Sequence, residues 1–282
     1  MSFSPDVSIT LTRYAEPNWL FLETLESLAQ QKNIRAHAFV LDQQNNEEIR
    51  TFCQQHSSDS IYLDYQVIPA KSLSYARNEA IRQCQTDLLF YIDTDAVAEP
   101  NWAQRLYAEM TKTQAAIAGG KIIPKWHKSP GLLQKSRFVL DQYSMLNLGD
   151  TTFKVKKVIG ANFAINKTLL GDLAHFDEEL GRQNGKLLGG EETQLCSDAN
   201  DNGLDVIYVG SAAVQHQVMP ERVSFKWISK RIYYGGYSRA LRGGKPEPSN
   251  GSEKLGGWDY FALVLLMPFY VWGYSQAKMS KS

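Results

Sequence analysis

Short apolar runs alternate with amphipathic segments along the first hundred residues. The runs are rich in β-branched and aromatic side chains, a pattern typical of buried strands, and the segments between them repeat apolar residues at helical spacing. We expect strands at residues 7–14, 35–44, 61–68 and 88–97, and helices that begin at Pro17 and cover 46–56 and 73–84. Alternating strands and helices predict an α/β fold with parallel pairing, in which ligands bind at the carboxyl ends of the strands.

The pattern is looser after residue 98. Strands are expected within residues 115–124, 157–170 and 205–218, and helices at 100–112, at 132–146 and from Glu191. Residues 125–157 form a lysine-rich insert that contains the second of these helices.

Residues 261–274, FALVLLMPFYVWGY, form an uncharged apolar and aromatic run. The run is shorter than the roughly 18 residues that a membrane span requires, and Pro268 lies inside it. The run has aromatic residues at its ends and two lysines beyond it, a composition typical of a segment at a membrane interface. These residues are Trp258, Tyr260, Tyr270, Trp272, Tyr274, Lys278 and Lys281. Two interpretations stay open, a helix packed on this domain or a second subunit, and a helix on a membrane surface.

The overall charge is balanced, with 30 basic and 30 acidic residues. This balance argues against nucleic acid as a partner and means that an anionic substrate must be held locally. Cys53, Cys84 and Cys196 are distant in sequence, lack CxxC spacing and leave one unpaired, which favours a reducing compartment. The N-terminus shows no signal or transit peptide, so we expect a cytoplasmic protein, with membrane contact at most peripheral at the inner face.

Asp93 and Asp95 end the apolar run LLFYIDTDAV. Along an extended chain their carboxylates point the same way, and two such anions repel each other unless a metal ion or a proton compensates them. The pair therefore predicts a divalent-cation site at the sheet edge. The alternative is that both residues cap a turn before a helix that starts near Pro100.

No glycine-rich phosphate-binding motif of the Rossmann or P-loop type is present. A nucleotide bound here therefore needs another means of neutralising its phosphates, and a cation on Asp95 would supply it.

Three later features are candidates for the same site. Glu192, Leu195, Cys196 and Ala199 fall at i, i+3, i+4 and i+7, which predicts that Glu192, rather than Glu191, lies on the buried face of its helix. The alternative is that both acids only complement the helix dipole. His216, near the end of a strand, is compatible with a metal site. Arg231 or Lys230 lies in a Lys-, Arg- and Tyr-rich segment and is a candidate phosphate ligand, unless that segment is a solvated amphipathic helix.

Taken together, these motifs resemble the family 2 glycosyltransferases of the GT-A fold, over roughly residues 5–240. The resemblance rests on six motifs in order, which are TRYAEP, the second strand ending in Asp42, SYARNEAI, IDTDA, GANFAI and GGEETQL, followed by a strand with His216. It implies a Rossmann-like, mixed but mainly parallel sheet flanked by helices. It also divides residues 1–240 into a nucleotide-binding half, 1–118, and an acceptor-binding half, 119–240, with 241–282 as a C-terminal extension.

The resemblance also implies roles for individual residues. Thr12, Tyr14 and Asp42 would line the base and ribose pocket, and Arg77 and Asn78 would position the nucleotide. Asp93 would face the ribose, and Asp95 would coordinate Mn²⁺ or Mg²⁺ with His216 as a further ligand. Glu192 stands where the family usually has the aspartate that acts as general base, so the choice between Glu192 and Glu191 is open. Arg13 replaces the usual proline before the tyrosine of the first loop.

The implied reaction is the inverting transfer of a sugar from a UDP-, GDP- or dTDP-sugar to a hydroxyl of a saccharide or lipid-linked acceptor, as in polysaccharide or glycoconjugate synthesis. Two alternatives remain. A sugar-1-phosphate nucleotidyltransferase would have a basic, glycine-rich loop after the first strand, which TRYAEPNW does not supply. A non-catalytic member of the same fold would bind a saccharide or another subunit. The donor sugar, base, acceptor and linkage have no readable code in the sequence.

Overall fold

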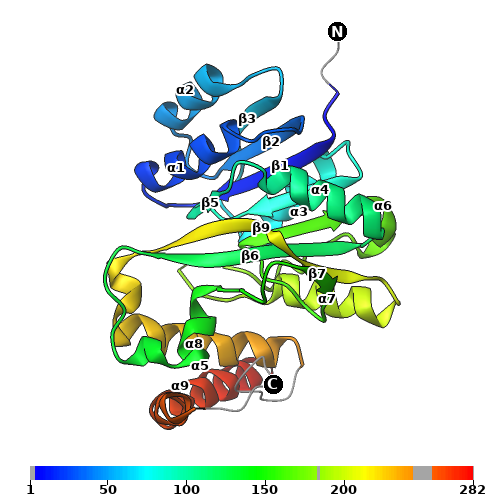
Figure 1. Ribbon diagram of the computed structural model, residues 1–282. Coiled ribbons are helices and arrows are strands. Elements are labelled where there is room, and N and C mark those ends of the chain that lie inside the picture. The colour runs from blue at the N-terminus through cyan, green and yellow to red at the C-terminus, as the bar shows by residue number, and fades with distance from the viewer. Residues whose placement is uncertain (1–3, 183–184, 244–255, 282) are drawn as a thin grey trace.

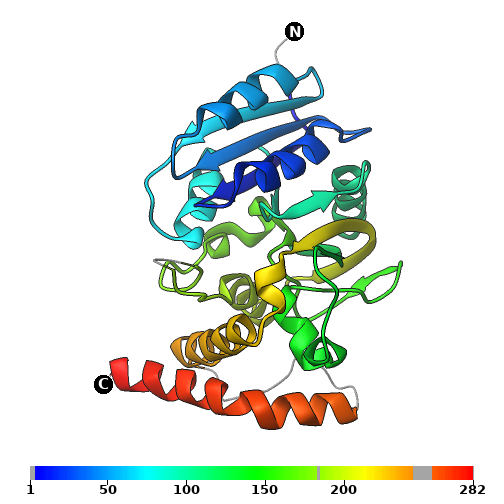
Figure 2. The same cartoon turned by 90° about the vertical axis from the view of Figure 1, so that its left-hand side faces the viewer.

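A computed structural model describes residues 4–182, 185–243 and 256–281. Its described residues form one nine-stranded mixed sheet with the order β3-β2-β1-β4-β8-β6-β9-β5, and β7 pairs with β9 (Figure 1). The strands of the first half lie at one end of the molecule and the last two long helices lie at the other (Figures 1 and 2). The expected mixed α/β sheet flanked by helices is confirmed.

The first half alternates strands and helices as predicted. Its elements are β1 (Val7–Arg13), α1 (Asn18–Ala29), β2 (Ala36–Asp42), α2 (Glu47–His56), β3 (Ile61–Val67), α3 (Leu73–Gln83) and β4 (Leu88–Ile92). β2 pairs in parallel with β1 and β3, and β1 pairs in parallel with β4. All five residues of β4 are buried, because helices cover both faces of the parallel sheet. The carboxyl ends of β1, β2 and β4 therefore meet at one edge.

The second half mixes strand directions. Its elements are β5 (Ala96–Ala98), α4 (Trp102–Thr113), β6 (Ile117–Trp126), β8 (Asn162–Asn166), α6 (Lys167–Leu170), η3 (Gly171–Leu173), α7 (Glu191–Asp201), β9 (Val206–Val218), η4 (Pro220–Val223) and α8 (Phe225–Leu241). β6 and β9 are parallel, but β8 runs antiparallel to both β4 and β6, which makes the sheet mixed, as expected. β8 follows the long insert rather than a crossover helix, and the parallel geometry that such a crossover imposes does not apply to it.

The insert does not form the expected helix over residues 132–146. It contains three short pieces instead, η1 (Leu133–Lys135), α5 (Arg137–Leu140) and η2 (Asp141–Tyr143), followed by the unpredicted strand β7 (Thr152–Lys154). The Ser136 side chain caps α5 by accepting from the backbone N–H of Val139, and Ser144 ends η2 with a positive φ of 59°. Local capping by serine therefore interrupts a segment whose apolar periodicity alone favours one helix.

The C-terminal extension forms α9 (Gly257–Lys281), a long helix with Pro268 inside it (Figure 2). Residues 244–255 of the extension lie outside the described residues. α9 packs against α8, where Gly273 meets the Tyr233 carbonyl and Gly236 meets the Tyr270 carbonyl so closely that a Cβ at either glycine would overlap. Packing on the domain, one of the two open interpretations of this segment, is thus observed. Among the described residues, α9 included, no helix has the length and hydropathy needed to cross a membrane.

The three cysteines are buried and free. Burial raises the pKa of the Cys53 thiol to about 12, with a further contribution from the charge of Asp64. Burial likewise raises the pKa of Cys196 to about 12. Cys53 and Cys196 are therefore core residues with little thiolate character.

Candidate active site

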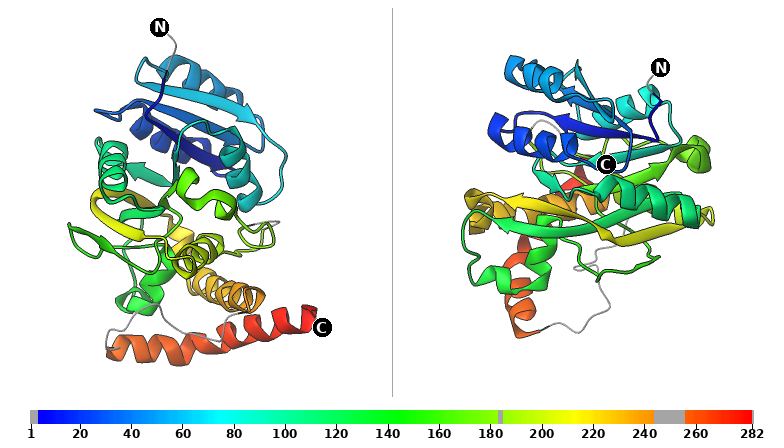
Figure 3. Two further views of the ribbon diagram at one scale, coloured as in Figure 1. Left: turned by 90° about the vertical axis from the view of Figure 1, so that its right-hand side faces the viewer. Right: turned by 45° about the horizontal axis from the view of Figure 1, so that its top comes forward.

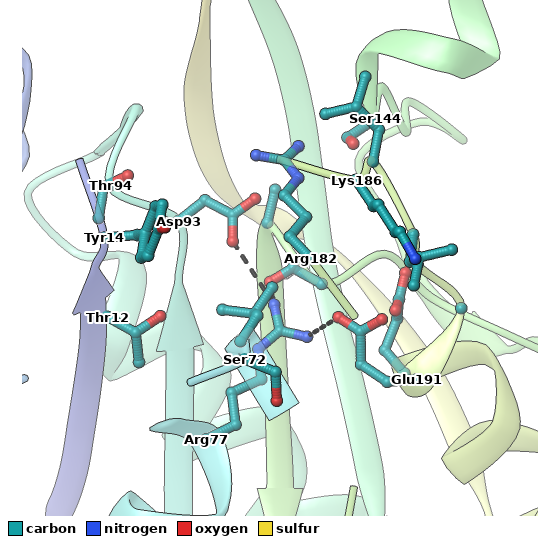
Figure 4. Close-up of a pocket in the computed structure, with 18 of the residues that line it drawn as sticks. Thr12, Tyr14, Ser72, Arg77, Asp93, Thr94, Ser144, Arg182, Lys186 and Glu191 are labelled. Atoms are coloured by element: carbon teal, nitrogen blue, oxygen red, sulfur yellow. Dashed lines mark hydrogen bonds and ion pairs between the residues drawn. The ribbon is translucent and has the colours of Figure 1, made fainter. Parts of the chain in front are cut away.

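A cavity of about 240 Å³ lies where the carboxyl ends of the first strands face the loop before α7. Thr12, Tyr14, Thr94 and Asp93 lie on one side of it, and Lys186, Ser144 and Glu191 on the other (Figure 4). In the views of the whole chain, α7 and the described part of the loop before it lie between the first strands and α8 (Figure 3). The cavity thus lies at the edge of the sheet where parallel strands are expected to present ligand-binding residues.

Asp93, Thr94 and Asp95 form a tight turn between β4 and β5. The backbone N–H of Ala96 donates to the carbonyl of Asp93 at 3.1 Å, and the Thr24 hydroxyl of α1 donates to the carbonyl of Thr94 at 2.9 Å. The turn expected in the alternative interpretation of Asp93 and Asp95 is present. The carboxylates do not cap it, however, because Asp93 pairs with Arg77 and Asp95 pairs with His216 and Arg222.

Asp95 is buried and held by two basic side chains. Oδ1 lies 3.2 Å from Nε2 of His216, and Oδ2 lies 2.8 Å from a guanidinium nitrogen of Arg222. Antiparallel pairing of β5 with β9, in which Ala96 faces His216, brings the imidazole to this carboxylate. Burial alone would raise the pKa of Asp95, but the neighbouring His216 and Arg222 overcome that effect and hold it below its usual value.

Asp93, Asp95 and His216 are suited to a divalent cation. One ligand atom of each can be chosen so that all three lie within 4.8 Å of one another, and no other such group occurs in the part of the chain that the structure describes. Adjacent ligands of an octahedral ion at 2.0–2.1 Å are about 3 Å apart, close to the 3.2 Å between the Asp95 oxygen and the His216 nitrogen. Carboxylate and imidazole donors together match Mn²⁺, while carboxylate oxygens alone also match Mg²⁺. The expected convergence of the two aspartates is confirmed.

Arg77 of α3 connects the two sides of the cavity. Its guanidinium donates to Glu191 at 2.7 Å, to the carbonyl of Gly160 at 3.3 Å and to Asp93 at 3.5 Å (Figure 4). A Cβ on Gly160 would lie 2.8 Å from this guanidinium, so the glycine permits the close approach. Arg77 therefore fixes Asp93 relative to the start of α7.

The structure reverses the predicted burial of the two glutamates. Glu191 is buried with only 4% of its side chain exposed, whereas Glu192 is half-buried, and both line the cavity. Gly190, with φ of 97°, starts α7 so that Glu191 rather than Glu192 meets Arg77. Burial and the charge of Glu192 raise the pKa of Glu191 to about 7, against the lowering effect of Arg77. Glu191 is thus held by Arg77, and Glu192 is the more exposed of the two carboxylates that line the cavity.

Two predicted nucleotide ligands lie outside the cavity lining. The Asp42 carboxylate is fully buried and accepts from Arg13 at 3.1 Å, from the Tyr65 hydroxyl at 2.7 Å and from the Gln44 N–H at 3.0 Å. Asn78 exchanges two hydrogen bonds with the backbone of Phe176. Both residues are occupied in holding neighbouring segments, and Gln43, beside Asp42, lines the cavity instead.

Most of the other predicted ligands line the cavity, together with cations that the sequence did not single out, whereas His216 contacts Asp95 from outside the lining. Thr12, Tyr14 and Arg231 line it, as do the unpredicted Arg182 and Lys186. Arg222, which pairs with Asp95, was also missed, because an arginine six residues after a histidine carries no recognisable motif. Burial and the nearby Arg182 lower the pKa of Arg231 to about 10.

A family model for glycosyl transferase family 2 matches residues 8–173, which is more than half of the chain. The chain belongs to glycosyl transferase family 2. This family 2 transferase is 27% identical over 244 residues to the glucosyl-dolichyl phosphate glucuronosyltransferase of Haloferax volcanii, covering 83% of this chain and 76% of the relative. It is 25% identical over 249 residues to the succinoglycan biosynthesis protein ExoM of Rhizobium meliloti, covering 82% and 72%.

Solved structures show the same fold. The transferase superimposes on GalNAc-T7 with UDP, GalNAc and Mn²⁺ with a TM-score of 0.60 at 15% identity, covering 88% of this chain and 52% of that one. The mannosyltransferase PcManGT from Pyrobaculum calidifontis, in complex with GDP-Man and Mn²⁺, gives a TM-score of 0.58 at 16% identity, covering 99% and 74%. The GT-A fold and the glycosyltransferase class are therefore established, which favours sugar transfer over the nucleotidyltransferase alternative.

Proposed function

We propose that this enzyme transfers a sugar, with inversion, from a nucleoside diphosphate sugar to an acceptor hydroxyl, with Glu192 as general base. The observation that carries the proposal is that Glu192 lines the same cavity as Asp93 and Asp95, and that His216 lies beside Asp95. One side is suited to holding a diphosphate through a cation. The other supplies a carboxylate to an attacking hydroxyl.

Residues from the first strands bind the donor in this proposal. Thr12 and Tyr14, at and just after the end of β1, contact the base and ribose, and Asp93 contacts the ribose hydroxyls. Asp42 and Asn78 support this pocket from behind, through the hydrogen bonds that hold their own loops. GDP-Man and UDP in the solved relatives support a nucleotide-sugar donor and leave the base open.

Asp95 and His216 would hold Mn²⁺ or Mg²⁺, with Asp93 as a further candidate ligand. When bound, such an ion neutralises the diphosphate and makes it a better leaving group. Arg231, whose guanidinium donates to the carbonyl of Leu187 at 2.9 Å and lines the cavity, provides a further positive charge for a phosphate. The relatives solved with Mn²⁺ support the role of a divalent ion.

Glu192 accepts the proton of the acceptor hydroxyl as that oxygen attacks the anomeric carbon. It lines the cavity and is half-buried, whereas Glu191 is held by Arg77. A hydroxyl needs such a base because its pKa is far above neutrality. A single base without a covalent nucleophile implies one in-line displacement, so an α-linked donor gives a β-linked product.

The names of the relatives bear on the acceptor. One is named for a glucosyl-dolichyl phosphate and another for succinoglycan, which supports a saccharide or lipid-linked acceptor for this enzyme. We assign the donor to residues 1–118 and the acceptor to 119–240, and place the enzyme in the cytoplasm or at the inner face of the membrane. Residues 258–274 contact a membrane surface or a second copy of the chain.

Glu192→Gln tests the proposal. The amide keeps the size of the side chain but cannot take a proton, so turnover should fall by about 10²- to 10⁴-fold. Binding of the nucleotide sugar, measured by calorimetry with Mn²⁺, should stay within about twofold, since Glu192 acts on the acceptor. The matched control is Asp201→Asn, at the exposed far end of the same helix, which should leave both quantities unchanged. Unchanged turnover in Glu192→Gln would exclude Glu192 as the base.

A further inference from the structure

α9 is apolar on the face that it turns toward the domain and also on the face that it turns away. The inner face supplies Ala262, Leu266 and Tyr270 to a cluster with Ile228 and Ile232 of α8. Burying one stripe of side chains is what an amphipathic helix ordinarily does on a folded domain. The outer stripe of such a helix is ordinarily polar.

The outer stripe of α9 carries large apolar side chains in contact with solvent. They are Trp258 (42% exposed), Phe261 (54%), Val264 (81%), Leu265 (40%), Val271 (53%) and Trp272 (59%). Their spacing of three, three, one, six and one residues keeps them on one side of the helix. Figure 2 shows α9 as a straight edge of the molecule, with α8 on one side of it only. A continuous exposed apolar stripe of this kind marks a surface that binds something.

Two lysines stand near aromatic side chains of α9. Lys135 lies 5.1 Å from the ring centroid of Trp258, and Lys278 lies 5.9 Å from that of Tyr274, so a lysine stands near each end. The acid of α9, Asp259, is buried and accepts from the hydroxyl of Ser136 and the N–H of Arg137. The described part of α9 itself therefore presents no exposed carboxylate to repel an anionic surface.

We propose that the outer face of α9 lies in the plane of an anionic lipid membrane. Trp258 and Trp272 are 14 residues apart, or about 21 Å along a helix, so they stand toward the two ends of the stripe. Tryptophan favours the depth of the lipid headgroups, where its ring is in apolar surroundings and its N–H meets water. The apolar side chains between them enter the acyl boundary, and the lysines contact anionic headgroups.

A second copy of the chain fits this face less well than lipid does. An isologous pairing of two antiparallel α9 helices would bring Lys278 of one copy toward Lys135 of its partner. Like charges facing across an interface disfavour association, and the described part of α9 offers no exposed acid to compensate them.

This placement brings the membrane close to the active site. α9 lies directly on α8, and α8 carries Arg231 to the cavity, so one helix layer separates the lipid from the site. A lipid-linked acceptor would then be presented by the same membrane that holds the enzyme. This last step rests on the proposed function, whereas membrane binding itself does not.

Co-sedimentation with vesicles tests the proposal on the whole chain. Wild-type protein should bind vesicles of phosphatidylcholine with 30% phosphatidylglycerol, and Val264→Glu should bind them at least about tenfold more weakly, because it places a charge at the most exposed point of the stripe. Val264 touches little of the domain, so the thermal midpoint of the variant should match that of the wild type. Tyr62→Glu is the matched control, since Tyr62 is a 45% exposed aromatic on β3, and it should bind vesicles like the wild type.

Two further variants test the contribution of the lysines near the stripe. Lys135→Gln and Lys278→Gln should each weaken binding to the anionic vesicles by about fivefold, with little effect on vesicles of phosphatidylcholine alone. Absence of wild-type binding to the anionic vesicles would overturn the proposal, as would equal binding by Val264→Glu. A wild-type dimer in light scattering that Val264→Glu dissociates would also overturn it, in favour of a second copy. The rate of sugar transfer to a water-soluble acceptor does not depend on membrane binding. Measuring that rate therefore distinguishes a failure of the membrane proposal from a failure of the proposed reaction.

Discussion

Asp42 and Asp95 are the same residue type in similar positions, yet their surroundings give them different capacities. Asp42 ends β2 and Asp95 follows β4, both are buried, and each is paired with an arginine. Around Asp42, Arg13, the Tyr65 hydroxyl and the Gln44 N–H satisfy both oxygens, and the side chain does not line the cavity. Around Asp95, a second carboxylate and an imidazole converge, and the side chain does line it. A position at the end of a strand thus makes an aspartate a candidate site residue. The groups around its carboxylate then decide whether it holds a loop in place or is able to bind a metal ion.

Asp95→Asn gives the largest expected effect on this comparison. It removes a negative charge from the metal-binding group, so Mn²⁺-dependent turnover should fall roughly a thousandfold, since metal stabilisation of a transition state amounts to several kcal/mol. Paramagnetic resonance of free Mn²⁺ should show weaker binding even without nucleotide. Asp59→Asn, an exposed acid on the loop before β3, is the control and should change neither value. Mn²⁺ binding as tight as that of the wild type would remove Asp95 from the metal site.

Arg13→Leu tests the Asp42 side of the comparison. It leaves a fully buried carboxylate without its cation, so the free energy of unfolding should fall by about 3–5 kcal/mol in urea titrations. Arg82→Leu, which breaks a pair between Glu79 and an arginine that is 51% exposed, should cost less than about 1 kcal/mol. Adding Asp42→Leu to Arg13→Leu should restore much of the loss, because the unpaired charge is then gone. A double variant no more stable than Arg13→Leu would show that Asp42 is not the source of the cost.

Tyr65→Phe gives the smallest expected effect. The phenol donates to Asp42 at 2.7 Å and accepts from the Asn46 N–H at 2.6 Å, and Asp42 keeps Arg13 in the variant. The free energy of unfolding should fall by about 1–2 kcal/mol, the usual value of a partly buried hydrogen bond and a donor left unpaired. The affinity for Mn²⁺ should be unaffected, because the structure keeps Asp42 apart from Asp95. A clear change in that affinity would show that the surroundings of Asp42 influence the metal site at Asp95.

The sequence predicts the parallel half of the fold well because local signals agree there. The apolar runs of β1 to β4 specify buried strands, and Asp93 and Asp95 stand out at the end of the last one. The second half depends on contacts between distant segments. The antiparallel register that sets His216 beside Asp95 joins strands more than a hundred residues apart, and no local pattern encodes it.

The sequence predicted many of the residues of the site, but not how their side chains are arranged. A helical period shows which residues share a face, but adjacent positions such as Glu191 and Glu192 differ by the rotation of the whole helix. That rotation is fixed by Gly190 and by the ion pair with Arg77, a residue more than a hundred positions earlier. The salt bridge of Arg222 to Asp95 and the binding of Asp42 by Arg13 are likewise pairwise choices that appear only once the chain is folded.

The glycine contacts between α8 and α9 have a mechanical consequence. Gly236 and Gly273 let the two backbones touch, so we expect a displacement of α9 to move α8 with it. α8 brings Arg231 to the cavity, and a force applied to the outside of α9 is therefore transmitted to the position of that guanidinium.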